Sequence, residues 1–146
     1  MKLVTIKSAS LKQYLADPEM LHKAKRPCVL IIRLKYKGRR YDFAVPLRSN
    51  INPSSPKDEY FPLPPRKTTK SKHRHGIHYI KMFPVRKDML LLFRHKGNAE
   101  AELIKSIIDK NEKAIVKECQ EYLIRYEKGL RPQYSTDIDL LIKFLK

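Results

Sequence analysis

The chain has 146 residues, of which 42% are hydrophobic and 9% aromatic. This is the size and composition of one domain with a real core, which we expect to span residues 1–146. No apolar run approaches the roughly 18–20 residues of a membrane span, and residues 1–7 lack the hydrophobic region of a signal peptide. The sequence therefore predicts a cytoplasmic domain and excludes membrane-spanning and wholly disordered proteins.

The positive charge is confined to the first two-thirds of the chain. In total, 32 Lys and Arg face 15 Asp and Glu, a formal net charge of +17. Residues 1–96 hold 23 basic and 6 acidic side chains, whereas residues 97–146 hold 9 of each. Cations gathered in this way attract polyanions. The pattern favours nucleic acid over a solubility device or an anionic membrane, because no amphipathic membrane helix accompanies it.

The first elements are short. Residues 1–7 alternate and favour a strand, after which Ser8-Ala9-Ser10 offers caps for a helix over 11–15 that ends before Pro18. Residues 17–27 are typical of a charged loop.

The clearest local signal is a β-hairpin. Residues 28–36 form a β-prone run, Lys37-Gly38 supplies the turn, and residues 39–45 alternate polar and apolar side chains. Period-2 alternation predicts one shared face on each strand, made of Leu30, Ile32 and Leu34 on the first and of Tyr41, Phe43 and Val45 on the second.

The hairpin is followed by a proline-rich segment. Residues 46–50 indicate a polar turn that ends the second strand, and five prolines between 51 and 75 exclude a helix and a central strand there. A short strand around Tyr60-Phe61 fits this segment. Residues 66–75 are the densest basic run, with five Lys or Arg and two His. A loop of this length inside one domain is functional or disordered.

The remaining elements turn helical. Residues 78–83 favour a strand, and 89–94 fit either a strand or a buried helical turn. From 99 to 126 an i, i+3/i+4 apolar stripe, interrupted at Asn111-Glu112, predicts two consecutive helices that Gly129 and Pro132 terminate. A last helix is capped by Ser135 or Thr136 and carries Ile138, Leu140, Leu141, Phe144 and Leu145 on its apolar positions.

These elements predict an α+β fold. A twisted, mainly antiparallel β-sheet forms the basic, β-rich part (residues 1–96), and the neutral helices of residues 97–146 pack against it. We expect the helices to cover the core while the basic sheet and loops face outward.

Neither cysteine pattern nor histidine spacing indicates a metal. Cys28 and Cys119 form no C-x-x-C pair and are typical of buried apolar fillers, and there is no H-E-x-x-H motif. We expect no metal and no cofactor.

Metal-free RNA cleavage needs a base for the ribose 2′-hydroxyl, cations for the phosphate and an acid for the leaving 5′ oxygen. Histidine suits the proton transfers and Arg or Lys suits the phosphate. The candidate catalytic residues are Ser49, Arg48, His75 and His78. The candidate RNA-binding residues are Lys25, Arg26, Lys57, Arg66, Lys67, Lys70, Lys72, His73, Arg74 and Lys81. Each has a plainer interpretation, since a turn serine is more often a cap and a basic run is more often a solvated face.

Three segments stand out in order along the chain. They are Met1-Lys2-Leu3-Val4-Thr5-Ile6 with Leu11 to Leu15, the hairpin that ends in Val45-Pro46-Leu47-Arg48-Ser49, and Gly76-Ile77-His78-Tyr79-Ile80-Lys81-Met82-Phe83-Pro84-Val85. Together they resemble the ToxN/AbiQ/CptN family, and the CptN-like branch in particular. The resemblance covers nearly the whole chain, and the helical C-terminus matches in layout only.

The resemblance implies a type III toxin–antitoxin toxin with a MazF/Kid-like sheet. Such toxins are metal-independent endoribonucleases that cut cellular RNA and their own repeat precursor, leaving 2′,3′-cyclic phosphate and 5′-hydroxyl ends. The implied partners are single-stranded cellular RNA and an antitoxin RNA pseudoknot, which inhibits the toxin in a toxin–RNA hetero-oligomer and takes part in phage defence.

The resemblance transfers one site residue directly. The family's active serine after Pro-Leu-x matches Ser49, whereas Arg48 replaces a Thr or Ser, and Ile51 and Cys28 stand where lysines are expected. Other cations then take their place, among them Arg48, Lys25, Arg26 and Lys57 or the His-rich loop.

We therefore expect Arg48 and Lys57 to bind phosphate, Ser49 to bond the phosphate or the 2′-hydroxyl, and His75 or His78 to move protons. Unpaired bases stack on some of Tyr36, Tyr41, Tyr60, Phe61 and Tyr79. A non-catalytic, ribosome-associated RNA-binding protein explains the charge equally well. A DNA-binding protein of a mobile element is a weaker alternative, because no helix-turn-helix or acidic cluster is visible.

Overall fold

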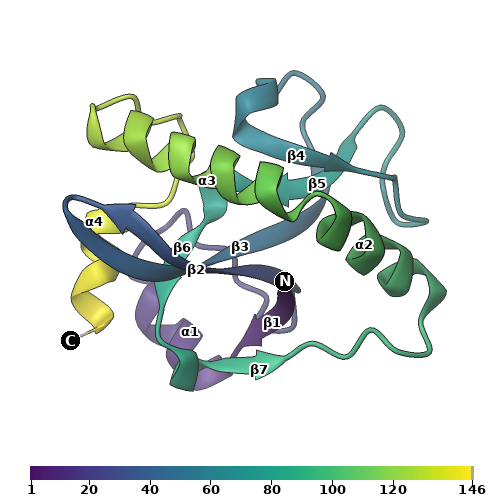
Figure 1. Cartoon of the computed structure of the whole chain (residues 1–146), viewed down its shortest axis with the longest axis horizontal. Helices are drawn as coiled ribbons and strands as arrows, with labels where there is room; N and C mark the ends of the chain where they lie inside the picture. Colours follow the sequence, from purple (N-terminus) through teal and green to yellow (C-terminus); the bar gives the residue numbers. More distant parts are fainter. Residues whose placement is uncertain (146) are drawn as a thin grey trace.

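The computed structural model describes residues 1–145 and shows a seven-stranded antiparallel sheet with helices on both faces (Figure 1). The strand order is β4-β5-β3-β2-β1-β7, and β6 pairs with β3 beside this path. The strands are β1 (Lys2–Ile6), β2 (Cys28–Tyr36), β3 (Arg39–Ile51), β4 (Tyr60–Leu63), β5 (Arg74–His78), β6 (Phe83–Val85) and β7 (Leu90–Leu92). The helices are α1 (Ser8–Tyr14), α2 (Ala99–Lys110), α3 (Glu112–Glu127) and α4 (Ile138–Ile142), with 3₁₀ helices η1 (Lys57–Glu59), η2 (Tyr79–Lys81), η3 (Lys87–Met89) and η4 (Lys143–Leu145). The predicted α+β class is confirmed.

The hairpin of β2 and β3 is confirmed, but one of its predicted faces is wrong. Lys37 and Gly38 both have positive φ, as a two-residue hairpin turn requires. Arg33 also has positive φ (59°), and the register shifts between Ile31 and Leu34. This bulge rotates the strand, so Ile32 is 57% exposed while Ile31 is buried.

The end predicted for β3 is also wrong. The strand does not stop at Pro46 but continues to Ile51, and its second half pairs with β5. The Leu47 amide donates to the Pro27 carbonyl on the β2 side. Backbone nitrogens of successive strand residues point toward opposite neighbouring strands. The nitrogen of Pro46 therefore points away from β2, to the side where η2, which lies between β5 and β6 in the chain, interrupts the pairing. The missing N–H of Pro46 therefore costs no ladder bond there.

Two further boundaries differ from the prediction. The expected strand over 78–83 is split into β5, η2 and β6, and β5 takes in Arg74 and His75 from the predicted loop. Ser8 to Ser10 form the first turn of α1 instead of capping it, and α4 is capped by Asp137, whose side chain accepts from the Leu140 amide. The two helices α2 and α3 and the short strand β4 are confirmed, and of the two alternatives left open for residues 89–94 the structure has the strand, β7.

Both faces of the sheet are buried, which corrects the expectation of an outward-facing sheet. One core lies under α2 and α3 and includes Ile108 and Leu123, and a second lies on the opposite face against α1 and α4, around Tyr14 and Leu141. Cys28 and Cys119 are free and buried, as predicted. Consequently the basic side chains gather on loops and on the rim of the sheet. No helix within residues 1–145 is long and apolar enough to cross a membrane.

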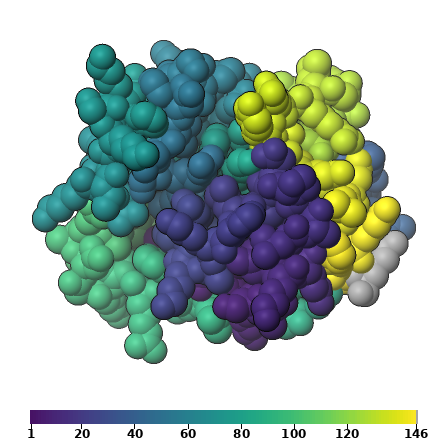
Figure 2. Space-filling model, turned by 180° about the vertical axis from the view of Figure 1, so that it is seen from behind, coloured from purple at the N-terminus to yellow at the C-terminus, as the bar shows by residue number. Residues whose placement is uncertain are grey.

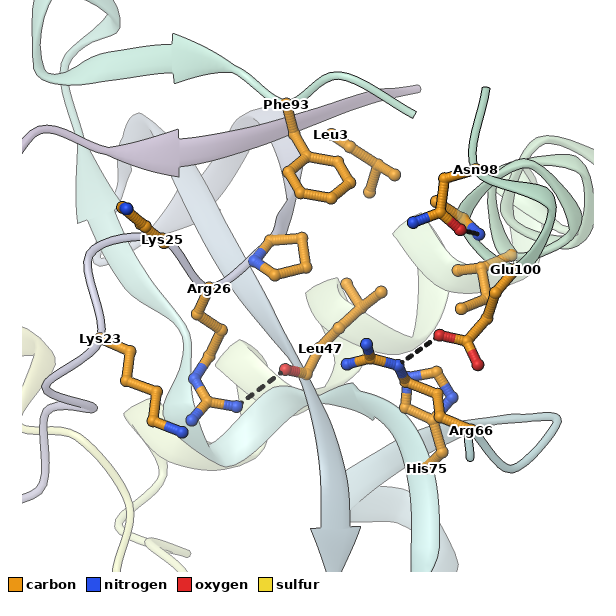
Figure 3. A pocket seen from close by; sticks show the side chains of 13 residues that line it. Leu3, Lys23, Lys25, Arg26, Leu47, Arg66, His75, Phe93, Asn98 and Glu100 are labelled. Atoms are coloured by element: carbon orange, nitrogen blue, oxygen red, sulfur yellow. Dashed lines mark hydrogen bonds and ion pairs between the residues drawn. The ribbon is translucent and has the colours of Figure 1, made fainter. Parts of the chain in front are cut away.

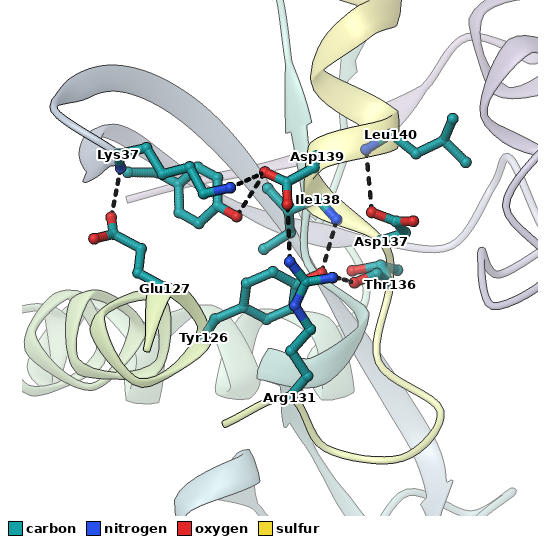
Figure 4. A network of polar contacts seen from close by, with 10 residues as sticks. Lys37, Tyr126, Glu127, Arg131, Thr136, Asp137, Ile138, Asp139 and Leu140 are labelled. Carbon is teal, nitrogen blue, oxygen red and sulfur yellow. Dashed lines mark hydrogen bonds and ion pairs between the residues drawn. The ribbon is translucent and has the colours of Figure 1, made fainter. Parts of the chain in front are cut away.

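A polar network ties the hairpin tip to the C-terminal segment (Figure 4). Asp139 accepts hydrogen bonds from the Tyr36 hydroxyl at 2.8 Å, from Lys37 Nζ at 2.9 Å and from Arg131 at 2.8 Å. The Arg131 guanidinium also lies 4.4 Å from the centre of the Tyr126 ring. Because these partners come from β2, α3 and α4, the network fixes the helices against the sheet.

Gly76 allows β5 to run close to β4. A Cβ at this position would collide with the Phe61 carbonyl oxygen and press on the Tyr60 ring. We expect Gly76→Ala to lower the free energy of unfolding by about 2 kcal/mol or more, since strand backbone has to move. Gly97→Ala is the control: its Cβ meets nothing, so only the positive φ of 81° costs stability, about 1 kcal/mol. Urea unfolding of both variants checks the order, and equal losses would contradict it.

Candidate functional site

The clearest concave site is a cavity of about 330 Å³ beside the middle of β3. Its lining comes from β1, the loop before β2, the second half of β3, the loop before β5 with the start of that strand, the segment after β7, and the start of α2 (Figure 3). Figure 2 shows the loop before β2, the loop before β5 and the segment around α2 gathered on one face of the molecule. The polar side chains of its lining are Lys23, Lys25, Arg26, Arg66, His75, Asn98 and Glu100.

Ser49 and Arg66 meet at the edge of this cavity. Arg66 Nη1 donates to Ser49 Oγ at 3.3 Å, and Arg66 Nε donates to Glu100 Oε1 at 2.8 Å. The backbone amide of Lys67 also approaches Glu100 Oε2 at 3.4 Å. The Glu100 carboxylate thus holds the Arg66 guanidinium beside the hydroxyl that the sequence singled out.

His75 lies on the same side of the sheet as Ser49. Its Nδ1 is 2.7 Å from the Pro64 carbonyl oxygen, which can only accept, so Nδ1 carries the proton and Nε2 keeps the lone pair. Burial lowers the pKa of His75. The hydrogen bond to Pro64 and the charge of Glu100 raise it and the charge of Arg66 lowers it, but burial is the largest effect and the pKa stays below its usual value. His75 is therefore neutral at pH 7 and able to accept a proton.

Arg26 adds a second guanidinium, which forms no ion pair with a carboxylate in the described part of the chain. Its Nη1 donates to the Leu47 carbonyl at 3.2 Å, while its Nε is buried and has no partner in residues 1–145. Burial lowers the pKa of Arg26, and the nearby charge of Arg66 lowers it further. Two cations this close in a partly desolvated corner favour an anionic ligand between them.

Arg48 and His78 form a separate pair on the opposite side of β3 from Ser49. Consecutive strand residues point to opposite faces, and Arg48 Nη1 lies 3.4 Å from His78 Nδ1. His78 is 4% exposed, and its Nε2 is buried with no partner among the described residues. Burial, with Arg48 and Lys81 nearby, lowers the pKa of His78 to about 3. The structure does not bring this imidazole to the cavity.

Other predicted RNA-binding residues fall into two groups. Lys67, Lys70, Lys72 and Arg74 are exposed along the loop and the start of β5, with His73 half-buried among them, and the Lys70 amide bonds Asn50 at 2.8 Å. Lys57 is exposed on η1, away from the cavity lining.

Lys81 corrects the prediction. It is 6% exposed, and its ammonium donates to the carbonyls of Glu19 and Tyr134 and to the Glu19 carboxylate. Since an ammonium has three donors, none remains for RNA. Its role is to join the loop after α1 to the segment before α4.

The aromatic candidates divide by burial. Tyr36, Tyr60 and Tyr79 are buried, so their rings are core and cannot stack on bases. Tyr41 and Phe61 are half-buried and keep part of their rings accessible.

Among the cavity residues that sequence reasoning missed are Phe93, Asn98 and Glu100. Phe93 follows β7, and Asn98 and Glu100 lie at the start of α2. They lie at the border of the neutral half, where no sequence pattern connects them to the basic loop. No cluster of three or more His, Cys, Asp or Glu suited to a metal occurs within residues 1–145.

Three solved structures share this fold over almost the whole chain. The first is from a bacterial antiviral system regulated by a processed non-coding RNA, with a TM-score of 0.71, 16% identity and coverage of 98% of this chain and 96% of the other. The second is from a bacterial type III toxin–antitoxin system in which a non-coding RNA pseudoknot inhibits the toxin, with a TM-score of 0.69, 17% identity and coverage of 97% and 94%. The third is AbiQ, a lactococcal anti-phage endoribonuclease of the type III toxin–antitoxin system, with a TM-score of 0.64, 14% identity and coverage of 97% and 93%.

No protein-family model and no curated protein matches the chain in sequence. The resemblance drawn from the sequence is thus confirmed at the level of the fold, and the CptN-like branch stays a prediction.

His78 makes stability depend on pH. Its pKa is about 3 in the folded chain and about 6.5 when unfolded, so the unfolded state binds more protons between these values. Its full contribution to the free energy of unfolding is therefore present above pH 6.5. The contribution decreases as the pH is lowered toward 3, by up to about 1.4 kcal/mol per pH unit. We expect His78→Gln to flatten the decline in urea-unfolding free energy between pH 7 and pH 4.5. The exposed His22→Gln should keep the wild-type slope, and equal slopes in both variants would contradict the prediction.

Proposed function

We propose that this chain is the toxin of a type III toxin–antitoxin system, a cytoplasmic, metal-independent endoribonuclease. The observation that carries the proposal is a cavity lined by a neutral imidazole and two guanidinium groups, one of which bonds a serine hydroxyl, in a fold shared with an endoribonuclease of such a system. Ser49, His75, Arg26 and Arg66 supply these groups. A strip of exposed cations on the loop before β5 continues from the cavity and suits a ribose-phosphate strand.

The chemistry is a transesterification within the RNA. His75 Nε2 removes the proton of a ribose 2′-hydroxyl, and the 2′ oxygen attacks the adjacent phosphorus. Arg66 and Arg26 hold the non-bridging oxygens as their charge grows, and the Ser49 hydroxyl donates to the same phosphate. The bond between phosphorus and the 5′ oxygen breaks, and that oxygen takes a proton from solvent water to leave as a 5′-hydroxyl, while the other product ends in a 2′,3′-cyclic phosphate. The proton held by His75 passes to solvent, which restores the neutral imidazole.

The proposed partners are RNAs. Single-stranded cellular RNA is the target, and an antitoxin RNA that folds into pseudoknots is both precursor substrate and inhibitor, bound in a toxin–RNA hetero-oligomer. The inhibition of a toxin of the same fold by an RNA pseudoknot supports this assignment. An RNA that stays bound after cutting blocks the cavity by occupying the same cations.

Cleavage in the presence of EDTA tests the proposal. Purified protein should cut single-stranded RNA without metal and leave 5′-hydroxyl ends that polynucleotide kinase labels directly. Ser49→Ala should slow cleavage about 100-fold, since it removes one donor to the developing charge, and should leave RNA binding intact. Ser106→Ala, an exposed change on α2, should keep full activity. Binding without cutting would instead indicate the non-catalytic RNA-binding protein, and cutting only with added metal would refute metal independence.

His75 should control the acid side of the pH–rate profile. Because burial holds its pKa below the usual value of about 6.5, kcat/KM should be level near neutral pH and fall only in more acidic solution. His75→Gln, whose amide can still donate to Pro64, should lower kcat/KM about 100-fold or more and abolish the acid limb. His22→Gln should leave the profile unchanged. A full acid limb in the His75 variant would assign the base to another group.

A further inference from the structure

We propose that the cavity beside Ser49 receives one unpaired nucleobase of the bound RNA, and that Asn98 determines which base it accepts. The proposal rests on the proposed function and deepens it, because it assigns sequence selectivity to part of the same site. The cations at the cavity account for phosphate binding, but they do not account for its remaining walls.

Those walls are apolar. They are formed by Leu3, Pro27, Leu47, Phe93, Ala101 and Ile104. Leu3 and Phe93 lie on the side of the cavity away from Arg66 and His75 (Figure 3). A phosphate alone gains nothing from such walls, whereas a flat heterocycle does. A volume of about 330 Å³ suits one base with part of its ribose, and apolar walls with a few convergent polar groups are typical of ligand sites.

Phe93 gives the cavity an aromatic wall. Its ring is half-buried and packs against the first core, and its backbone amide donates to the Leu3 carbonyl at 2.9 Å. The ring is therefore held in place before RNA binds. Unpaired bases commonly stack on aromatic side chains fixed in this manner.

Asn98 supplies an oriented hydrogen-bond donor at the rim. Its Oδ1 caps α2 by accepting from the Ala101 amide at 3.1 Å. This bond fixes which end of the amide is oxygen, and the Nδ2 group points toward the cavity in Figure 3. A donor in a fixed position distinguishes bases by where each presents an acceptor on its edge.

Glu100 connects the two parts of the site. Its carboxylate bonds Arg66, which also contacts Ser49, and it lines the cavity two residues after Asn98. A base in the cavity therefore places the phosphate of the same or the adjoining nucleotide at Arg66. Selectivity should accordingly appear at one nucleotide position next to the cut.

Asn98→Asp is the decisive variant. Aspartate caps a helix as well as asparagine does, so α2 is retained while the donor becomes an acceptor. In one reaction, a pool of RNAs that differ only at the nucleotides flanking the cut is digested and the ratios of cleavage rates are measured. We expect the wild-type preference at one flanking position to fall about tenfold or to move to another base. Ratios within one pool cancel any uniform loss of RNA affinity caused by the added negative charge.

Asn52→Asp is the matched control. Its Oδ1 accepts from the Ser54 amide in the same way, at 2.9 Å, but it is exposed and does not line the cavity. It should keep the wild-type preference.

Ala101→Leu, which narrows the cavity without removing a polar group, should slow cleavage of the preferred RNA about tenfold relative to disfavoured RNAs.

The outcomes separate the two proposals. A wild-type protein that cuts RNA while Asn98→Asp and Ala101→Leu keep its base preference overturns the base cavity and leaves the nuclease standing. A wild-type protein that cuts no RNA overturns the proposed function, and the base cavity with it. Altered preference in both variants, with Asn52→Asp unchanged, supports the cavity.

Discussion

The whole arrangement depends on β3, which is long enough to pair with three other strands of the sheet. Its first half pairs with β2 and β6, and its second half pairs with β5. Both cores therefore draw on one strand, with Val45 in the first and Ala44 in the second. Because side chains alternate along it, the strand also sorts the polar residues near its end, sending Ser49 toward the cavity and Arg48 toward His78.

The electrostatics of the site follow from what the fold leaves unpaired. Lys81 is buried, and its three donors are satisfied by the chain itself, so it strengthens the fold and contributes nothing outside. Arg26 and Arg66 are only partly buried, and the Glu100 carboxylate pairs with Arg66, whereas Arg26 bonds the Leu47 carbonyl. A cation that is desolvated without a full set of partners raises the free energy of the empty site. Under the proposed function, an RNA phosphate would relieve that cost, so that affinity and catalysis would both depend on these guanidinium groups.

Much of the fold could be predicted from the sequence because its signals were local. The Lys37-Gly38 turn, the break at Asn111-Glu112 and the stop at Gly129 are backbone requirements that neighbouring residues reveal. The end of β3 could not be predicted, since Pro46 is harmless only because η2 lies opposite it. The site shows the same limit. Ser49 was predicted from the family resemblance. The sequence did not show that His75 lines the cavity and His78 does not, because this depends on β5 beginning at Arg74.

The neutral half of the chain is more than a support for the basic half. Residues 97–146 balance their charges and cover one core, yet the first turn of α2 contributes Asn98 and Glu100 to the cavity wall. An acidic side chain placed there would repel RNA if it were free, but Glu100 is bound to Arg66 and to the Lys67 amide. The pairing neutralises the carboxylate and at the same time aims the guanidinium at Ser49. Division of the chain into a cationic part and an inert helical part therefore fails at this point, where the proposed selectivity and the proposed phosphate binding depend on one ion pair.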